Sequence, residues 1–144
     1  MIRKFKEYDL DKVMSIWLDS NVKAHSFIPK AYWESNYDFV KSVIPEAEVY
    51  VYEEDDNVCG FIGLDDNYIA GLFVEETYRS NGIGKQLLNY VKAIKSELRL
   101  KVYKKNERAI DFYKREQFAI ETEAIDENTN ELEYVMRWTI NEGS

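Results

Sequence analysis

Two spacings of apolar residues divide the chain into expected helices and strands. Some stretches repeat apolar residues at intervals of three and four, which is typical of helices that pack by one face. Shorter runs alternate apolar and polar residues, or are apolar throughout, as strands are. The expected helices cover about residues 9–22, 30–43, 83–94 and 106–116. The expected strands cover residues 2–5, 47–54, 58–64, 68–76, 98–103, 118–125 and 132–140. Helices and strands are interspersed without strict alternation, so we expect an α+β domain with a mixed sheet.

Local signals refine these elements. Pro29 suits the first turn of the second helix, where its missing N–H is not needed. Asn106 is placed to cap the last helix. Gly71 interrupts a strand pattern, which indicates a bulge or a close approach of the backbone. The polar stretch DENTN, residues 126–130, is expected to join the last two strands as an antiparallel pair.

Length and composition favour one soluble domain. The 144 residues fit a single domain, expected over residues 1–142 with Gly143–Ser144 set aside as an expression remnant. No apolar run approaches the ~20 residues of a membrane helix, and the N-terminus lacks the apolar segment of a signal peptide. Cys59, the one cysteine, lies in an apolar run and is expected to be a small buried side chain. We therefore expect a cytoplasmic monomer or homodimer with no membrane partner.

Charge is distributed unevenly along the chain. The net charge of −8 argues against a nucleic-acid partner held by general attraction to phosphates. Residues 79–115, however, carry 11 Lys and Arg against 3 Asp and Glu, a local net charge of +8. The remainder has a net charge of −16. This division suggests one region for an anionic ligand and another for a cationic one, unless the charges only solvate helix faces.

The sequence R-x-x-G-x-G, residues 79–84, lies between an expected strand and an expected helix. It is not a P-loop, because Lys85 is followed by Gln86, and it is not a dinucleotide fingerprint, because Leu87 replaces the third glycine. Glycines let the backbone approach a ligand, and the first N–H groups of a helix are free to bind an anion. The amides of residues 81–85, with Arg79 and Lys85, therefore form a candidate pyrophosphate site. The alternative is an ordinary glycine-rich turn.

At this point the chain resembles a known family. LFVEETYRSNGIGKQLL, residues 72–88, resembles the acetyl-CoA-binding motif of the GNAT superfamily of N-acetyltransferases. A second family block follows at the expected distance, LKVYKKNERAIDFYKREQF, residues 100–118. Gln117 stands where the family has glycine, so we expect a different turn there. The segment of residues 17–33 further resembles small bacterial acetyltransferases of the YjaB type. The family pattern N-x-x-A-x-x-F-Y-x-x-x-G-F is matched at Asn106, Ala109, Phe112, Tyr113 and Phe118.

The resemblance implies a fold and a cofactor site. The fold would be a mostly antiparallel twisted sheet of about six to seven strands with about four helices, splayed between residues 68–74 and 98–103 to admit acetyl-CoA. Acetyl-CoA would be the acyl donor and no metal would be needed. The residues it implies for cofactor binding are Leu72, Phe73, Val74, Arg79, Ser80, Asn81, Gly82, Ile83, Gly84, Lys85, Asn106, Ala109 and Phe112.

The implied reaction is attack of a neutral amine on a thioester, with a proton supplied to the departing thiolate. Tyr113 holds the family's position for that donor, and a phenol of pKa about 10 stays protonated at neutral pH. Spacing alone favours a core aromatic in the row Ala109, Phe112 and Tyr113, and the family motif reverses that preference. His25, the one histidine, is the candidate base, because an unperturbed imidazole titrates near ~6.5. It is otherwise a structural or exposed side chain. Carboxylates acting through a water are further alternatives, namely Glu75, Asp65 and Glu48.

The acceptor is expected to be an amine of a small molecule or peptide. The acidic surplus outside residues 79–115 favours a cationic acceptor. Aromatic residues of the second helix region either wall an acceptor pocket or belong to the core: Phe27, Tyr32, Trp33 and Tyr37. The sequence thus predicts an N-acetyltransferase working by direct transfer in a ternary complex. A non-catalytic acyl-CoA-binding sensor, which would not need Tyr113, and a nucleotide-binding interaction domain are the alternatives.

Overall fold

A computed structural model describes residues 1–79 and 81–140. Within them, the strands form one seven-stranded sheet in the order β1-β2-β3-β4-β5-β7-β6. β4 and β5 are parallel neighbours, and the other neighbouring pairs are antiparallel. The strands are β1 (Ile2–Lys4), β2 (Glu48–Glu54), β3 (Asn57–Asp65), β4 (Tyr68–Val74), β5 (Glu97–Tyr103), β6 (Ala119–Asp126) and β7 (Glu131–Thr139). The helices are α1 (Leu10–Ala24), α2 (Lys30–Val43), α3 (Ile83–Lys92) and α4 (Glu107–Arg115), with short 3-10 turns at Glu7–Asp9, Ile44–Glu46 and Glu76–Tyr78. The predicted mixed sheet and its helices are confirmed.

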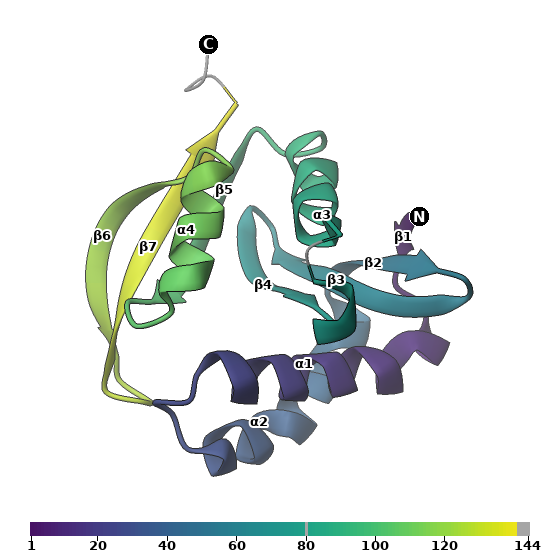
Figure 1. Cartoon of the computed structure of the whole chain (residues 1–144), viewed down its shortest axis with the longest axis horizontal. Helices are drawn as coiled ribbons and strands as arrows, with labels where there is room; N and C mark the ends of the chain where they lie inside the picture. Colours follow the sequence, from purple (N-terminus) through teal and green to yellow (C-terminus); the bar gives the residue numbers. More distant parts are fainter. Residues whose placement is uncertain (80, 141–144) are drawn as a thin grey trace.

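Helices cover the sheet from both sides, as Figure 1 shows. The side chains of β2 alternate between the two faces, so that Tyr50 packs with α3 and α4 while Val49 and Val51 pack with α1 and α2. On the first face, the apolar positions of α3 close over the sheet. On the second face, α1 supplies a fully buried stripe that includes Val13 and Met14. The two apolar clusters thus pack on opposite faces of the sheet. None of the helices in the described residues is long and apolar enough to cross a bilayer.

The sheet opens between β4 and β5. In the described part of the chain these strands pair only at Tyr68 with Arg99 and at Ile69 with Leu100. Beyond those pairs β4 continues beside β3 and β5 continues beside β7, so the two strands diverge (Figure 1). A register shift in the β3–β4 ladder falls between the pairs Gly63–Gly71 and Leu64–Ile69, which confirms the bulge predicted at Gly71. We call the β5-side edge of residues 70–74 the open edge of β4.

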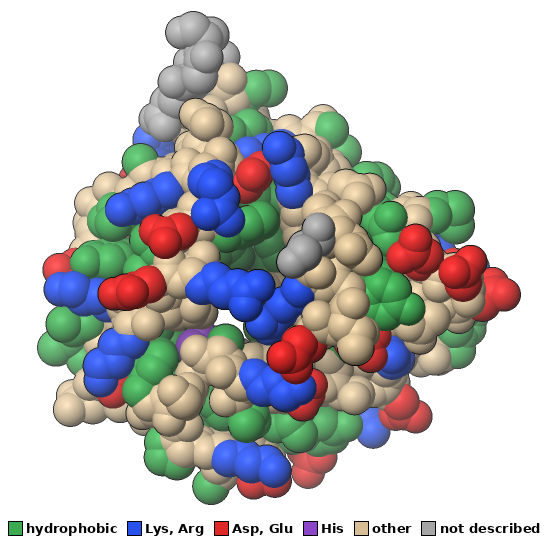
Figure 2. Space-filling view, in the orientation of Figure 1, with side chains coloured by type: hydrophobic (Ala, Val, Ile, Leu, Met, Phe, Trp, Pro, Cys, Tyr) green, Lys and Arg blue, Asp and Glu red, His purple; other side chains and the backbone are tan. Residues whose placement is uncertain are grey.

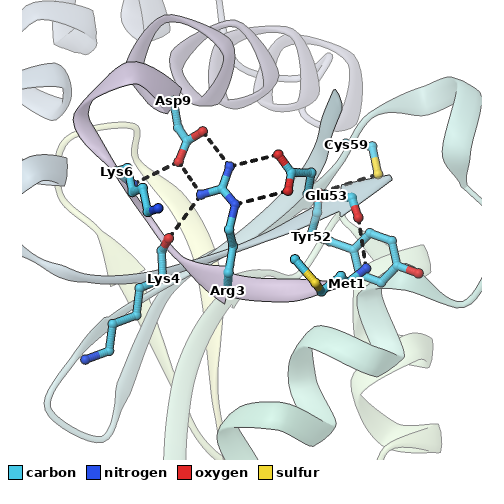
Figure 3. Close-up of polar contacts among 8 residues, drawn as sticks. All are labelled: Met1, Arg3, Lys4, Lys6, Asp9, Tyr52, Glu53 and Cys59. Carbon is cyan, nitrogen blue, oxygen red and sulfur yellow. Dashed lines mark hydrogen bonds and ion pairs between the residues drawn. The ribbon is translucent and has the colours of Figure 1, made fainter. Parts of the chain in front are cut away.

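A network of ion pairs fixes the N-terminal strand to the rest of the sheet (Figure 3). The Arg3 guanidinium donates to both carboxylate oxygens of Asp9 at 2.8 and 2.9 Å and to Glu53 at 3.2 and 3.3 Å. The main-chain N–H of Lys6 also donates to Asp9. Burial alone would raise the pKa of Asp9, but the hydrogen bonds from Arg3 and Lys6 outweigh it and lower the pKa. The network joins β1, the turn before α1 and β2.

Two local predictions were wrong. The helix expected over residues 83–94 ends at Lys92, and Ile94 lies outside it with 51% of its surface exposed. The expected new turn at Gln117 is not formed: Gln117 takes the left-handed conformation of a glycine, with φ of 74°. The other expectations held more closely, since Cys59 is buried and Asn106 caps α4.

Candidate acetyl-CoA and acceptor site

The glycine turn before α3 has the conformation that its sequence requires. Gly82 is the N-cap residue with φ of 75°, a left-handed conformation that side chains disfavour. The first intrahelical bond runs from the N–H of Gln86 to the carbonyl of Gly82, so the amides of residues 83–85 precede the helical ladder. Those amides and the helix dipole suit a phosphate. Ser80 lies outside the described residues.

The turn lies close to α4 and β4. A Cβ added to Gly84 would be 3.6 Å from the Phe112 ring and 3.8 Å from Val74, an ordinary contact distance with little room to spare. Gly82, Asn81 and Lys85 are exposed, whereas Arg79 is half-buried. Figure 2 shows a hollow in the middle of this face, with Lys and Arg side chains gathered along its rim. The sequence-predicted cofactor loop thus opens beside the gap between the strands.

The open edge of β4 carries the main chain of Leu72, Phe73 and Val74. Leu72 and Val74 pack on the cluster beneath α3 and α4, and Phe73 packs on the opposite cluster, where its ring lies 5.4 Å from that of Phe61. All three residues pair with β3 on their other side. Main-chain groups along the open edge therefore suit the amides of an extended ligand such as pantetheine. Side-chain packing and ligand contact are compatible there.

The start of α4 is fixed by Asn106. Its Oδ1 accepts a hydrogen bond from the N–H of Ala109 at 3.3 Å. Its Nδ2 therefore faces the ring of His25, 3.2 Å from Nε2. Since an amide nitrogen only donates, Nε2 of His25 is the acceptor. Asn106 thus links the loop after α1 to the first turn of α4.

His25 is enclosed by aromatic rings. Only 8% of its surface is exposed, and its ring stacks on Trp33 at 5.3 Å and meets the edge of Tyr103 at 5.1 Å. Its Nδ1 is buried without a hydrogen-bond partner. Burial lowers the pKa of His25 to about 4, against a smaller opposing effect of the Asn21 carbonyl. At neutral pH His25 is a neutral ring and a weaker base than an exposed histidine.

Tyr113 is buried on the α4 face of the opening. Its ring packs between Phe112 and Phe118, with centroids 5.1 and 5.5 Å away, and 9% of its surface is exposed. Burial raises the pKa of Tyr113, and the nearby Tyr68 hydroxyl adds to the rise. Tyr113 therefore stays protonated over the physiological range. This state is the one that a proton donor to a thiolate requires.

Of the other predicted carboxylates, Glu75 and Glu48 have lysine partners, although Oε2 of Glu75 is buried without one, and Asp65 and Glu48 line the cavity described below. Glu75 accepts from Lys12 at 3.1 Å. Glu48 accepts from the Tyr50 hydroxyl at 2.6 Å and from Lys95 at 3.0 Å. Asp65 is exposed at the end of β3. The hydrogen bonds from Tyr50 and Lys95 lower the pKa of Glu48, so Glu48 gains less from taking up an amine proton.

A cavity of about 610 Å³ lies between the second half of α2 and β4. Apolar side chains of α2, among them Phe39 and Val43, form one wall, and Gly71 and Phe73 of β4 form the other. Tyr68, which the sequence did not single out, also lines it. Of the four aromatic residues predicted to wall an acceptor pocket, Trp33 is buried in the core cluster on the α1 and α2 side of the sheet. Phe27, Tyr32 and Tyr37 are half-buried against that cluster.

Comparisons with known proteins agree with this architecture. A sequence profile described as an acetyltransferase (GNAT) domain matches residues 45–120. The chain is 32% identical to the peptidyl-lysine N-acetyltransferase YiaC of Escherichia coli strain K12 over 142 residues, 97% of both chains. It is 30% identical to the peptidyl-lysine N-acetyltransferase YjaB of the same strain, covering 83% of this chain and 82% of YjaB. The solution structure of apo YjaB from Escherichia coli matches with a TM-score of 0.85 at 26% identity, covering 96% of each chain.

Proposed function

The chain belongs to the GNAT family of acetyltransferases, and we propose that it moves the acetyl group of acetyl-CoA to the side-chain amine of a peptidyl lysine. One observation carries the proposal: the glycine turn before α3 lies against Val74, at the open edge of β4. An anion-binding helix start and a row of unpaired main-chain groups together suit a ligand that has a pyrophosphate at one end and an amide chain beyond it.

The residues present fit acetyl-CoA. The amides of Gly82 to Lys85 and the charges of Arg79 and Lys85 would hold the pyrophosphate. The main chain of residues 72–74 would bind the pantetheine arm. Asn106, Ala109 and Phe112 would line the other side, where Phe112 already closes on Gly84. Acetyl-CoA supplies the thioester, whose carbonyl carbon is the electrophile.

Transfer would be direct. The amine nitrogen forms a bond to the thioester carbonyl carbon, the carbon–sulfur bond breaks, and its electron pair leaves on sulfur. The Tyr113 hydroxyl gives its proton to the thiolate. The thiolate pKa near ~8.5 lies below that of a phenol, and burial of Tyr113 widens this difference, so the proton transfer is uphill. The nitrogen loses one proton to a base. His25 was the base expected from the sequence; its assignment stays a prediction.

A lysine side chain is the proposed acceptor because the relatives at 32% and 30% identity are named for peptidyl-lysine. The net charge of the chain supports this choice. A protein of net charge −8 attracts a lysine-bearing segment and disfavours an acidic one.

The test is calorimetric titration of the wild-type protein with acetyl-CoA, followed by release of free CoA in the presence of lysine-containing peptides. We expect binding in the micromolar range, about −8 kcal/mol. The Gly82→Glu variant places a negative charge in the turn and should lose binding. Asn89→Glu adds the same charge on an exposed position of the same helix and should bind as wild type.

The outcomes separate the two halves of the proposal. No binding at millimolar acetyl-CoA would overturn the cofactor assignment and the function together. Binding of acetyl-CoA without acetylation of any lysine peptide would support the cofactor site and overturn the assignment of a lysine acceptor. Equal loss of binding in both variants would mean that added negative charge alone, rather than the glycine turn, controls affinity.

A further inference from the structure

A half-buried carboxylate, Glu133 of β7, lies on the face of the sheet opposite to Tyr113. Glu133 is the cross-strand partner of Tyr103 in the β5–β7 ladder. Residues directly opposite in an antiparallel pair project to the same face. Tyr103 belongs to the cluster on the α1 and α2 side of the sheet. Glu133 therefore projects to that side, whereas Tyr113 belongs to the cluster on the other side.

Charged and phenolic groups from every neighbouring element surround this carboxylate. Burial raises the pKa of Tyr68 of β4, and the charge of Glu133 adds to the rise. Burial also raises the pKa of Tyr32 of α2, with further contributions from Asp126 and then from Glu133. From β5 come Lys101 and Tyr103, and from β6 comes Asp126, whose carboxylate accepts from the Tyr103 hydroxyl at 2.7 Å. Glu133 thus lies among α2, β4 and the β5–β7 sheet.

Glu133 is left without a fixed partner in this setting. Among residues 1–79 and 81–140, the ion pairs and side-chain hydrogen bonds do not include it, although Lys101 is near enough to favour its charge. Its neighbour on the same face of β7, Glu131, is by contrast paired with Lys105 at 3.1 Å. Burial raises the pKa of Glu133, and the charge of Asp126 adds to the rise. A half-buried carboxylate without a partner is costly, and such groups concentrate at functional sites.

Tyr68 connects the two sides. Tyr68 lies at the point where β4 and β5 still pair. Tyr68 contributes to the raised pKa of Tyr113, and Glu133 contributes to the raised pKa of Tyr68. It also lines the cavity under α2. The proposed proton donor and the unpaired carboxylate therefore lie on opposite faces of the sheet, and Tyr68 feels the charge of the second.

We propose that Glu133, half-buried on the α1 and α2 side of β7 opposite Tyr103, binds the acceptor's primary amine and takes the proton that its nitrogen loses. The proposal rests on the proposed function. A carboxylate without a fixed partner suits an alkylammonium, through charge and hydrogen bonds. The ammonium first loses one proton to solvent, which gives the neutral amine that attacks. When its nitrogen bonds to the carbonyl carbon it becomes acidic, and this second proton passes to the Glu133 carboxylate. The Tyr113 proton goes to sulfur, and the resulting carboxylic acid and phenolate exchange protons with solvent.

Glu133→Gln tests the assignment, with Glu131→Gln as the matched control on the same face of β7. We expect Glu133→Gln to lower kcat/KM for a lysine peptide about a hundredfold or more, the usual range for a general base. The acidic limb of its pH–rate profile should disappear, and acetyl-CoA affinity should equal that of wild type. The melting temperature should equal or exceed that of wild type, because a neutral amide replaces a partly desolvated charge. Glu131→Gln should retain turnover within threefold.

Failure of this inference is distinguishable from failure of the function. If wild type acetylates lysine peptides and Glu133→Gln does so at a similar rate with its acidic limb unchanged, Glu133 is not the proton acceptor and the function stands. A lower melting temperature together with lower acetyl-CoA affinity would assign Glu133 a structural role and overturn the inference. If wild type binds acetyl-CoA but acetylates no lysine peptide, the proposed acceptor class fails, and the proposed role of Glu133 fails with it.

Discussion

The main-chain N–H of Phe118 donates a hydrogen bond of 2.9 Å to the carbonyl oxygen of Tyr113, across the end of α4. The N–H of Gln117 donates to the carbonyl of Lys114 at 3.1 Å, so the two bonds together form a Schellman motif. The rings of Phe118 and Tyr113 also meet, with centroids 5.5 Å apart. The motif fixes the helix turn that carries the proposed proton donor. It does so with Gln117 at φ of 74°, where glycine would be unstrained.

Replacing Gln117 by glycine should therefore stabilise the protein. The strain of a left-handed side chain is about 1–2 kcal/mol, and the extra freedom of glycine in the unfolded chain offsets about 0.5–1 kcal/mol of it. We expect Gln117→Gly to raise the free energy of unfolding by about 0.5–1 kcal/mol, measured by urea denaturation. Gln117→Ala keeps the strain and serves as the control. A gain in Gln117→Ala equal to that in Gln117→Gly would show that the side chain, and not the backbone conformation, limits stability.

The contact between His25 and Asn106 predicts a cofactor-binding effect. His25→Phe keeps an aromatic ring among Trp33 and Tyr103 but removes the acceptor of the Asn106 amide. A lost hydrogen bond of about 1 kcal/mol corresponds to a roughly fivefold to tenfold change in affinity. We expect the KM for acetyl-CoA to rise by about that factor, with kcat within threefold of wild type. Steady-state kinetics at saturating peptide measure both.

The same variant tests the role that the sequence suggested for His25. If kcat collapsed, acetyl-CoA affinity stayed intact and one ionisation vanished from the pH–rate profile, His25 would be the proton acceptor. The assignment of Glu133 would then be untenable. His25→Phe and Glu133→Gln measured side by side give opposite patterns for the two assignments.

Burial of His25 also predicts how stability depends on pH. Its pKa is about 4 in the folded protein and near ~6.5 when unfolded, so the unfolded chain takes up the proton first as the pH falls. The contribution of His25 is complete above about pH 6.5 and is lost as the pH falls toward 4, at most roughly 3 kcal/mol. Denaturation midpoints of wild type should fall across this window. Those of His25→Phe should stay flat until carboxylates titrate, and a parallel fall in both proteins would exclude His25 as the cause.

Much of the fold was readable because periodicity and turn signals are local. α2 begins and ends where its pattern predicted, and the bulge at Gly71 followed from one glycine in a strand. The error at Gln117 arose because the preference of a single residue was taken to decide the turn. The two main-chain bonds at the end of α4 and the contact of Phe118 with Tyr113 hold Gln117 in a conformation that side chains disfavour.

The sequence predicted the cofactor side of the candidate site better than the acceptor side. The spacing of the glycines predicts the cofactor loop. Glu133, by contrast, is one polar residue in a strand of alternating pattern, and nothing in that pattern indicates a function. Its alternation, with Tyr134 and Met136 on the core side, does place Glu133 on the other face. Whether that face meets solvent or a neighbouring helix depends on how β4 and β5 diverge, which is a long-range property of the sheet. The same divergence brings Tyr68 and Tyr113 near each other.

Tyr113→Phe should separate chemistry from binding. The ring packing between Phe112 and Phe118 is preserved, so acetyl-CoA affinity and thermal stability should stay close to wild type. Without the hydroxyl the thiolate leaves unprotonated, and kcat should fall about a hundredfold. Tyr90→Phe, a partly exposed tyrosine of α3, is the control and should turn over normally. Calorimetry gives the affinity and CoA release gives the rate. Unchanged kcat in Tyr113→Phe would assign the proton to another donor, because a buried phenol that only packs can lose its hydroxyl without a kinetic effect.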